Sequence, residues 1–332
     1  MTYPHSTYTT TRGLTYSCIR IPPQSPNTPY ILFLHGFPST SHDWRHQVSF
    51  FAEKGYGILA PDLLGFGETS KPSDLEMYRG EGMAQDIVEI LALEGTGVVV
   101  GVAHDWGSFL LSRLANYHPE RISAYAFIDH GYAAPGQSLT PEVIQHINSA
   151  VQAKLGFSIL GYFLFFDEED AATLLDKHSE SVESLYFTND DEINKTYKGA
   201  PGGLRAWLTE GKMADVPAYR TIEDRNHYQN AFSLEKGGYG PAINWYRASL
   251  RNINKDDEKK ITTPAHTLTH PTLLIASTKY AITVAINYPE QMRPLVSDLR
   301  VENVTGGHWL QLEQADEVNK ILEEFITEKR QI

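Results

Sequence analysis

The sequence predicts an α/β fold with a mostly parallel, doubly wound sheet and a block of helices inserted between two of its strands. Over residues 30–128, short apolar runs alternate with amphipathic helical patterns, as in consecutive βα units. From Pro135 to about Leu250 this alternation stops and the chain is expected to be mostly helical. A strand pattern resumes at residues 272–276, so both flanks of the helical block belong to the same sheet.

This pattern divides the chain into two expected domains. Residues 1–134 and 255–332 should form the sheet core, and residues 135–254 a helical cap over the carboxyl ends of the strands. Open α/β sheets bind their ligands at those ends. We therefore expect the functional site between core and cap.

The individual elements follow from apolar spacing. An edge hairpin is expected around Leu14–Ile21. The further strands expected from short apolar runs are 30–34, 56–60, 98–103, 122–128, 272–276 and 298–304. The helices expected around the sheet, from apolar residues at helical spacing, are 41–52, 81–93, one from Ser108 to near His118, and 314–328.

Composition narrows the classes of partner. The formal charge of −13, from 28 basic and 41 acidic residues, argues against nucleic acid or an anionic membrane surface and leaves neutral or cationic small substrates open. The single cysteine, Cys18, excludes an internal disulfide and fits a reducing compartment. No signal-peptide pattern and no run of roughly 18 apolar residues is present. We expect a cytoplasmic monomer or homodimer.

Residues 98–107 have the layout of a nucleophile elbow, in which a strand, a sharp turn and a helix lift one side chain above the sheet edge. Small residues, Ala103 and Gly107, stand two places either side of Asp105, where the usual residue is serine. A carboxylate there suggests attack on a saturated carbon. The alternative is that Asp105 caps the following helix, a common role for aspartate.

Three separated segments each end a strand with polar residues. They are His35-Gly36-Phe37-Pro38, His104-Asp105-Trp106 and Gly306-Gly307-His308-Trp309. In a doubly wound sheet such ends converge, so a nucleophile, a late histidine base and backbone donors would meet at one site. His308, in a glycine-rich turn before the last helix, fits the expected chain order for the base.

Five motifs in register resemble the soluble epoxide hydrolases of the α/β-hydrolase fold, over a length from about residue 10 to the end. The motifs are His35-Gly36-Phe37-Pro38, Asp62-Leu-Leu-Gly-Phe-Gly-Glu-Thr-Ser-Lys-Pro72, His104-Asp105-Trp106-Gly107, Asn244-Trp245-Tyr246-Arg247 and Gly307-His308-Trp309. The resemblance implies a helical cap on an α/β-hydrolase core and conversion of an epoxide to a vicinal diol.

The resemblance also implies roles for residues of the core. Asp105 would attack the epoxide and form an alkyl ester, and water activated by His308 would hydrolyse that ester. The backbone amides of Phe37 and Trp106 would form the oxyanion hole. The Phe37–Pro38 peptide bond is expected to be cis. The implied reactants are a small apolar epoxide and water, with no cofactor.

Two tyrosines of the cap are the implied proton donors to the epoxide oxygen. Tyr246 matches the Asn-Trp-Tyr-Arg segment, and Tyr162 lies in the aromatic segment Gly161–Phe166. A tyrosine with a pKa near ~10 stays protonated at neutral pH and can donate to a developing alkoxide. The alternative for Tyr162 is a core role, since aromatic stripes are usually core and the chain has 18 tyrosines.

The acid that orients the histidine departs from the family pattern. Tyr280 stands roughly where most members carry an aspartate, and no acid follows before Glu290. Related hydrolases sometimes place this acid after the strand that follows the elbow helix, a position occupied here by Asp129. We expect Asp129 to be the orienting acid; a structural role, or an enzyme without a full triad, are the alternatives.

Metal binding is not expected. The pairs His42/His46 and His266/His270 have ligand-like spacing, but no convincing third ligand is near either pair. His104 is expected to be structural.

Two alternative functions stay open. A haloalkane dehalogenase would share the aspartate nucleophile, although many dehalogenases carry asparagine where Phe37 stands. A catalytically inactive ligand-binding protein of the same fold is the other. The physiological epoxide and the regio- and stereoselectivity are not encoded in any motif.

Overall fold

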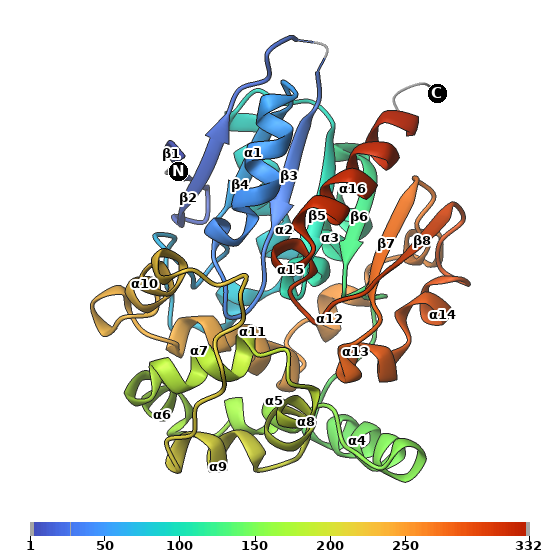
Figure 1. The fold of residues 1–332 in the computed structure, drawn as a ribbon. Helices are drawn as coiled ribbons and strands as arrows, with labels where there is room; N and C mark the ends of the chain where they lie inside the picture. The colour runs from blue at the N-terminus through green and yellow to red at the C-terminus, as the bar shows by residue number, and fades with distance from the viewer. Residues whose placement is uncertain (1–2, 27, 330–332) are drawn as a thin grey trace.

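The structure, a computed structural model, describes residues 3–26 and 28–329 (Figure 1). In this part of the chain an eight-stranded sheet has the order β1-β2-β4-β3-β5-β6-β7-β8. The strands are β1 (His5–Thr9), β2 (Thr15–Ile21), β3 (Tyr30–Leu34), β4 (Gly57–Pro61), β5 (Val99–His104), β6 (Ile122–Ile128), β7 (Thr272–Ser277) and β8 (Leu299–Val304). Strands β3 to β8 run parallel, and β1 and β2 form an antiparallel edge. The predicted mostly parallel sheet is confirmed.

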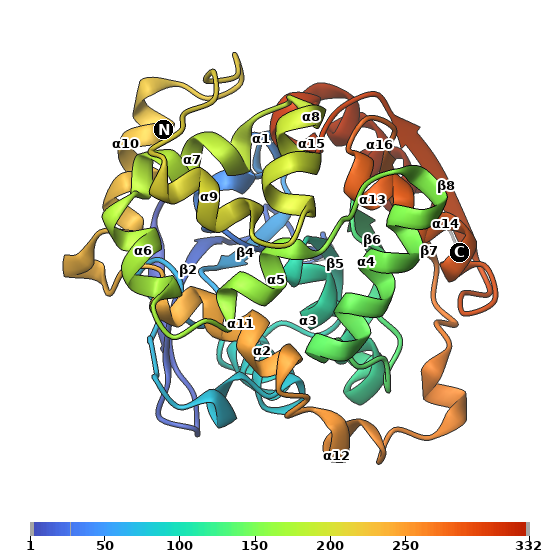
Figure 2. The same cartoon turned by 90° about the horizontal axis from the view of Figure 1, so that it is seen from below.

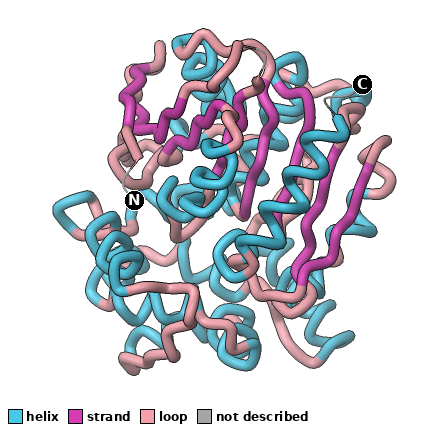
Figure 3. Tube along the Cα trace, turned by 45° about the horizontal axis from the view of Figure 1, so that its top comes forward, coloured by secondary structure: helices cyan, strands magenta, loops and turns pink. Residues whose placement is uncertain are grey.

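Helices cover both faces of the sheet (Figure 3), which is why β4, β5 and β7 are buried throughout. Helices α1 (Arg45–Glu53) and α16 (Ala315–Lys329) pack on one face, and α2 (Gly80–Leu93) and α3 (Trp106–Tyr117) on the other. Within β3, Ile31 and Phe33 face the first pair of helices, and Leu32 and Leu34 the second. The expected helix at 41–52 is divided: a 3₁₀ turn at Ser41–Trp44 precedes α1.

Between β6 and β7 the chain forms helices only. These are α4 (Pro141–Leu155), α5 (Gly161–Phe166), α6 (Ala171–Lys177), α7 (Ser179–Phe187), α8 (Asp191–Ile193), a π-helical turn (Asn194–Gly199), α9 (Gly203–Thr209), α10 (Ile222–Ala231), α11 (Gly240–Leu250) and α12 (Lys255–Glu258). We call residues 141–258 the helical block. It lies below the carboxyl ends of the strands (Figure 1), and α5 and α11 cross beneath the central ones when viewed from that side (Figure 2).

The connections after β7 and β8 complete the fold. Helices α13 (Ala281–Ile286) and α14 (Tyr288–Met292) follow β7, and α15 (Leu310–Glu313) follows β8. Single 3₁₀ turns occur at Leu75–Tyr78, Pro119–Arg121, Leu234–Lys236 and Thr263–His266. Within the described ranges, no helix has the length and apolar character needed to span a membrane.

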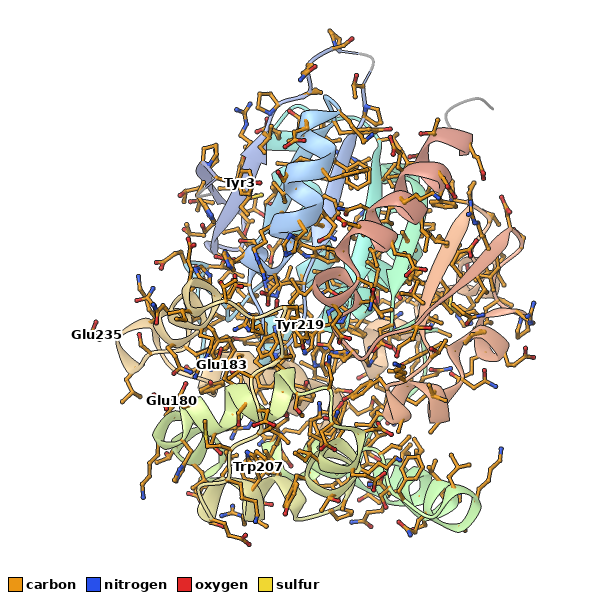
Figure 4. All side chains as sticks on the ribbon, in the orientation of Figure 1. Tyr3, Glu180, Glu183, Trp207, Tyr219 and Glu235 are labelled. Carbon is orange, nitrogen blue, oxygen red and sulfur yellow. The ribbon has the colours of Figure 1, made fainter. Side chains whose placement is uncertain are left out.

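A buried charge cluster fastens the helical block to the core. Arg220 lies 2.8 Å from Glu183 and 3.5 Å from Asp43, and its guanidinium stacks 3.8 Å from the ring centroid of Phe187. Asp224 of the block forms an ion pair with Arg45 of the core at 3.0 Å. Figure 4 labels Glu183 and Tyr219 at this junction between block and sheet. Burial alone would raise the pKa of Asp43, but the charges of Arg220 and Arg45 lower it, so this carboxylate stays ionised.

We predict that Arg220→Met lowers the free energy of unfolding by about 3 kcal/mol, because it removes the closest cation from the buried carboxylate of Glu183 and leaves that of Asp43 with Arg45 alone. Chemical denaturation measures the change. Arg205→Met is the matched control: Arg205 pairs with Glu168 and Asp170 at the surface, so its loss should cost less than about 1 kcal/mol. Equal losses in the two variants would contradict the role given to Arg220.

Candidate active site

The turn between β5 and α3 presents Asp105 at the carboxyl edge of the sheet. Its backbone has φ 54° and ψ −123°, an unfavourable region for a residue with a side chain. The carboxylate makes no capping hydrogen bond to α3. The alternative role of Asp105 as a helix cap is therefore wrong, and its side chain is directed to other partners.

Two glycines allow this turn to close. A Cβ atom on Gly107 would lie 2.1 Å from the carbonyl oxygen of Leu34, and one on Gly36 would lie 2.2 Å from Oδ1 of Asp105. Neither distance is possible for real atoms. The elbow therefore requires glycine both at position 107 on α3 and at position 36 on the loop after β3. The spacing around Asp105 had suggested a small residue at position 107.

One oxygen of Asp105 is held by the backbone. The amide of Phe37 donates to Oδ1 at 2.7 Å. The Phe37–Pro38 peptide bond is cis, as predicted. The amide of Trp106 belongs to the first turn of α3, where backbone N–H groups have no helical acceptor. Of the two predicted oxyanion donors, the Phe37 amide thus contacts the carboxylate, and the role of the Trp106 amide stays a prediction.

The structure brings His308 and Asp129 to this carboxylate. His308 Nδ1 lies 2.6 Å from Oδ2 of Asp129, and its Nε2 lies 3.8 Å from Oδ2 of Asp105. Asp129 follows β6 directly and also accepts a hydrogen bond from Thr283 at 2.7 Å. Tyr280 contributes no acid: its ring centroid lies 5.1 Å from that of His308.

The protonation states suit a nucleophile and a base. Burial would raise the pKa of Asp105, but the neighbouring histidines and the Phe37 amide lower it below its ordinary value. Burial lowers the pKa of His308 more than Asp129 raises it, so the imidazole is neutral at pH 7. Burial also lowers the pKa of His104 to about 3, and its Nε2 lies 2.9 Å from the carbonyl oxygen of His308. A neutral His104 can donate there and support the turn that carries His308.

His130 is a site residue that the sequence analysis missed. Its Nε2 lies 3.9 Å from Oδ2 of Asp105, and its Nδ1 3.6 Å from Oδ2 of Asp129, so two imidazoles face the same two carboxylates. Burial lowers the pKa of His130, but Asp129 and Asp105 outweigh it and the net shift is upward. His130 directly follows Asp129 at a strand end, and that position was the available signal.

The helical block places a group of tyrosines above Asp105. Tyr162 and Tyr246 are buried, with ring centroids 5.8 Å apart, and the ring of Tyr246 lies 4.9 Å from that of Trp106. Burial and the charge of Asp105 raise the pKa of both phenols, which keeps them protonated. Tyr186 joins them: its ring lies 5.3 Å from Phe37, and its buried hydroxyl has no hydrogen-bond partner. No motif distinguished Tyr186 from the other tyrosines.

Comparison with known proteins identifies the family. A family model described as "alpha/beta hydrolase fold" matches residues 29–315, which is most of the chain. The chain belongs to the α/β-hydrolase fold family. The fold class predicted from the motifs is therefore confirmed.

The α/β-hydrolase relatives similar to this chain carry epoxide hydrolase names. "Bifunctional epoxide hydrolase 2" of Rattus norvegicus is 30% identical over 305 residues, covering 89% of this chain, which spans about half (51%) of that relative. "Epoxide hydrolase A" of Mycobacterium tuberculosis is 28% identical over 325 residues, 91% of each chain. The crystal structure of epoxide hydrolase A from Mycobacterium thermoresistibile superimposes with a TM-score of 0.80 at 25% identity over 98% of both chains. The resemblance stated from the sequence is confirmed.

We predict that Asp129→Asn lowers the pKa of His308 further, because the carboxylate of Asp129 is the group that most raises it against burial. Titration of the imidazole C–H resonances by NMR measures this. Asp167→Asn is the control, since Asp167 pairs with Arg251 at the surface and should leave the titration unchanged. If the His308 titration were unaltered in Asp129→Asn, the conclusion that Asp129 raises the pKa of His308 would be wrong.

Proposed function

We propose that this protein is an epoxide hydrolase, which converts an epoxide to a vicinal diol through an ester on Asp105. The observation that supports this most is that the two oxygens of the Asp105 carboxylate have different partners. Oδ1 accepts the Phe37 amide, while Oδ2 lies 3.8 Å from the neutral base His308. An ionised carboxylate whose Oδ1 is held by a backbone amide, and whose Oδ2 lies 3.8 and 3.9 Å from two imidazoles, is suited to attack on carbon.

In the first step Oδ2 of Asp105 attacks an epoxide carbon from behind. A carbon–oxygen bond to the enzyme forms as the ring carbon–oxygen bond breaks. The leaving oxygen takes a proton from Tyr162 or Tyr246, whose phenols stay protonated because burial raises the pKa of each. The products of this step are an alkyl ester and a tyrosinate.

In the second step His308 accepts a proton from water, and the resulting hydroxide attacks the ester carbonyl of Asp105. The amides of Phe37 and Trp106 stabilise the tetrahedral oxyanion. Collapse of this intermediate releases the diol alkoxide, which takes the proton held by His308. The regenerated carboxyl group of Asp105 loses the second proton of the water, and the tyrosinate regains one proton by exchange with solvent. The balance is one epoxide and one water to one diol.

The aromatic rings around Tyr246 favour an epoxide whose oxirane is attached to an apolar group. The rings of Phe163 and Phe166 lie 4.8 and 4.5 Å from that of Tyr246, and Phe37 lies 5.3 Å from it on the core side. We also propose that residues 135–254 act as the cap domain that excludes bulk water. The names of the relatives support the assignment as an epoxide hydrolase. We also propose a cytoplasmic location, which the single, buried and unpaired Cys18 supports.

We predict that one turnover in heavy-oxygen water, with enzyme in excess over styrene oxide, places the label in the peptide that contains Asp105. Water attacks the ester carbonyl, so its oxygen stays on the carboxylate while an enzyme oxygen leaves in the diol. Mass analysis of the peptide detects the label. Diol formed without label would exclude the ester route. A parallel run with 1-bromohexane tests the haloalkane dehalogenase alternative, and no turnover of either compound would favour an inactive binding protein.

We predict that Tyr246→Phe slows ring opening by about 100-fold, because the alkoxide loses a proton donor. Pre-steady-state kinetics of ester formation with styrene oxide measures this step. Tyr239→Phe is the control: Tyr239 is buried nearby, but its hydroxyl bonds Ser179 and Tyr228. A comparable loss in both variants would indicate a packing effect instead of proton donation.

A further inference from the structure

A lysine is buried beside the candidate active site. Lys198 lies in the π-helical turn Asn194–Gly199, and 2% of its surface is exposed. Its Nζ lies 4.9 Å from the ring centroid of Tyr280 and 5.2 Å from that of Tyr186. Tyr280 in turn packs on His308. One aromatic ring therefore separates this ammonium group from the catalytic base.

The carboxylates whose charges act on Lys198 are engaged with other groups. Asp105 accepts a hydrogen bond from the Phe37 amide. Asp129 accepts hydrogen bonds from His308 and Thr283. Asp191 forms an ion pair with Lys195 at 2.9 Å and accepts a hydrogen bond from the backbone amide of Ala281 at 3.0 Å. Among the residues that the structure describes, no carboxylate oxygen lies within 4 Å of Lys198 Nζ. The two contacts with aromatic rings offset only part of the free-energy cost of removing the Lys198 ammonium group from water.

An ammonium buried without an ion-pair partner is costly to the fold. The hydroxyl of Tyr186 is a second buried donor without an acceptor, and Tyr186 is one of the two rings that contact Lys198. Two adjacent residues thus offer hydrogen-bond donors and a positive charge, with no acceptor supplied by the described residues. Such a pair suits a carboxylate, which has one negative charge and accepts more than one hydrogen bond.

We propose that Lys198 binds a carboxylate group of the substrate, so that the preferred epoxides are those bearing an anionic group about one aromatic ring away from the oxirane. This inference rests on the proposed function and adds a substrate class to it. Without a local cation, Asp105 and Asp129 would repel such a substrate. The overall charge of −13 matters less, because exposed charges beyond about 8 Å are screened at physiological ionic strength.

Lys198 also predicts a pH dependence specific to anionic substrates. Burial lowers the pKa of Lys198 to about 7, against the opposing charges of Asp105, Asp129 and Asp191. The rings of Tyr186 and Tyr280 complete its surroundings, and burial raises the pKa of both phenols, so they stay neutral. As pH rises through about 7, Lys198 loses its charge, and KM for a carboxylate substrate should increase relative to that for a neutral one.

The test compares 4-oxiranylbenzoate with the neutral 4-oxiranylbenzamide. Wild type should favour the benzoate in kcat/KM, and Lys198→Met should lower the benzoate-to-benzamide ratio at least about tenfold, mainly through KM. Methionine matches the length of lysine and tolerates burial. Lys195→Met is the matched control: Lys195 is in the same turn but pairs with Asp191 and Glu192, so the ratio should be retained.

Calorimetric binding of the unreactive 4-ethylbenzoate separates this inference from the proposed function. If wild type hydrolyses styrene oxide but binds 4-ethylbenzoate no better than Lys198→Met does, the carboxylate site is refuted and the hydrolase assignment stands. If 4-ethylbenzoate binds in a Lys198-dependent way but no epoxide is hydrolysed, the anion site stands and the proposed function fails. A loss of activity in Lys198→Met that is equal for both epoxides would show that Lys198 only balances the buried carboxylates, and would also refute the proposal.

Discussion

The hydrogen bond from the Phe37 amide to Oδ1 of Asp105 is the interaction on which the site depends. It requires that the loop after β3 approach the elbow so closely that neither Gly36 nor Gly107 can carry a side chain. It also helps keep a fully buried carboxylate ionised. With Oδ1 fixed in this way, Oδ2 is the oxygen that faces His308, and the roles of the two oxygens follow from backbone geometry alone.

Most of the fold and part of the site could be predicted because both follow from local patterns. Apolar runs mark the parallel strands, and polar residues at three strand ends identify Phe37, Asp105 and His308. Asp129 was predicted in another way, from the position that the acid occupies in some related hydrolases. The strand-end pattern worked because parallel strands bring their carboxyl ends to one edge regardless of their separation in sequence.

The residues that were missed depend on packing between distant segments. No motif includes His130, and its place beside Asp105 follows from the packing that brings two imidazoles to the same carboxylates. Tyr186 and Lys198 lie in the helical block, where no periodic pattern indicates which side chains face the sheet. Lys198 in particular is in a charged segment that would ordinarily be exposed, and only the folded chain shows that it is buried.

The charge cluster around Arg220 has a mechanical consequence. Asp43, its partner in the core, accepts a hydrogen bond from Ser39, and Thr40 lies 3.0 Å from His227 of the helical block. Ser39 is two residues from Phe37, so the loop that carries the Phe37 amide is tied to the block. If the helical block moved away from the core at this edge to admit a substrate, the loop would move with it. The hydrogen bond from the Phe37 amide to Asp105 would then weaken. A motion that admits a substrate and preserves the contact between Phe37 and Asp105 would therefore have to leave this edge of the block in place.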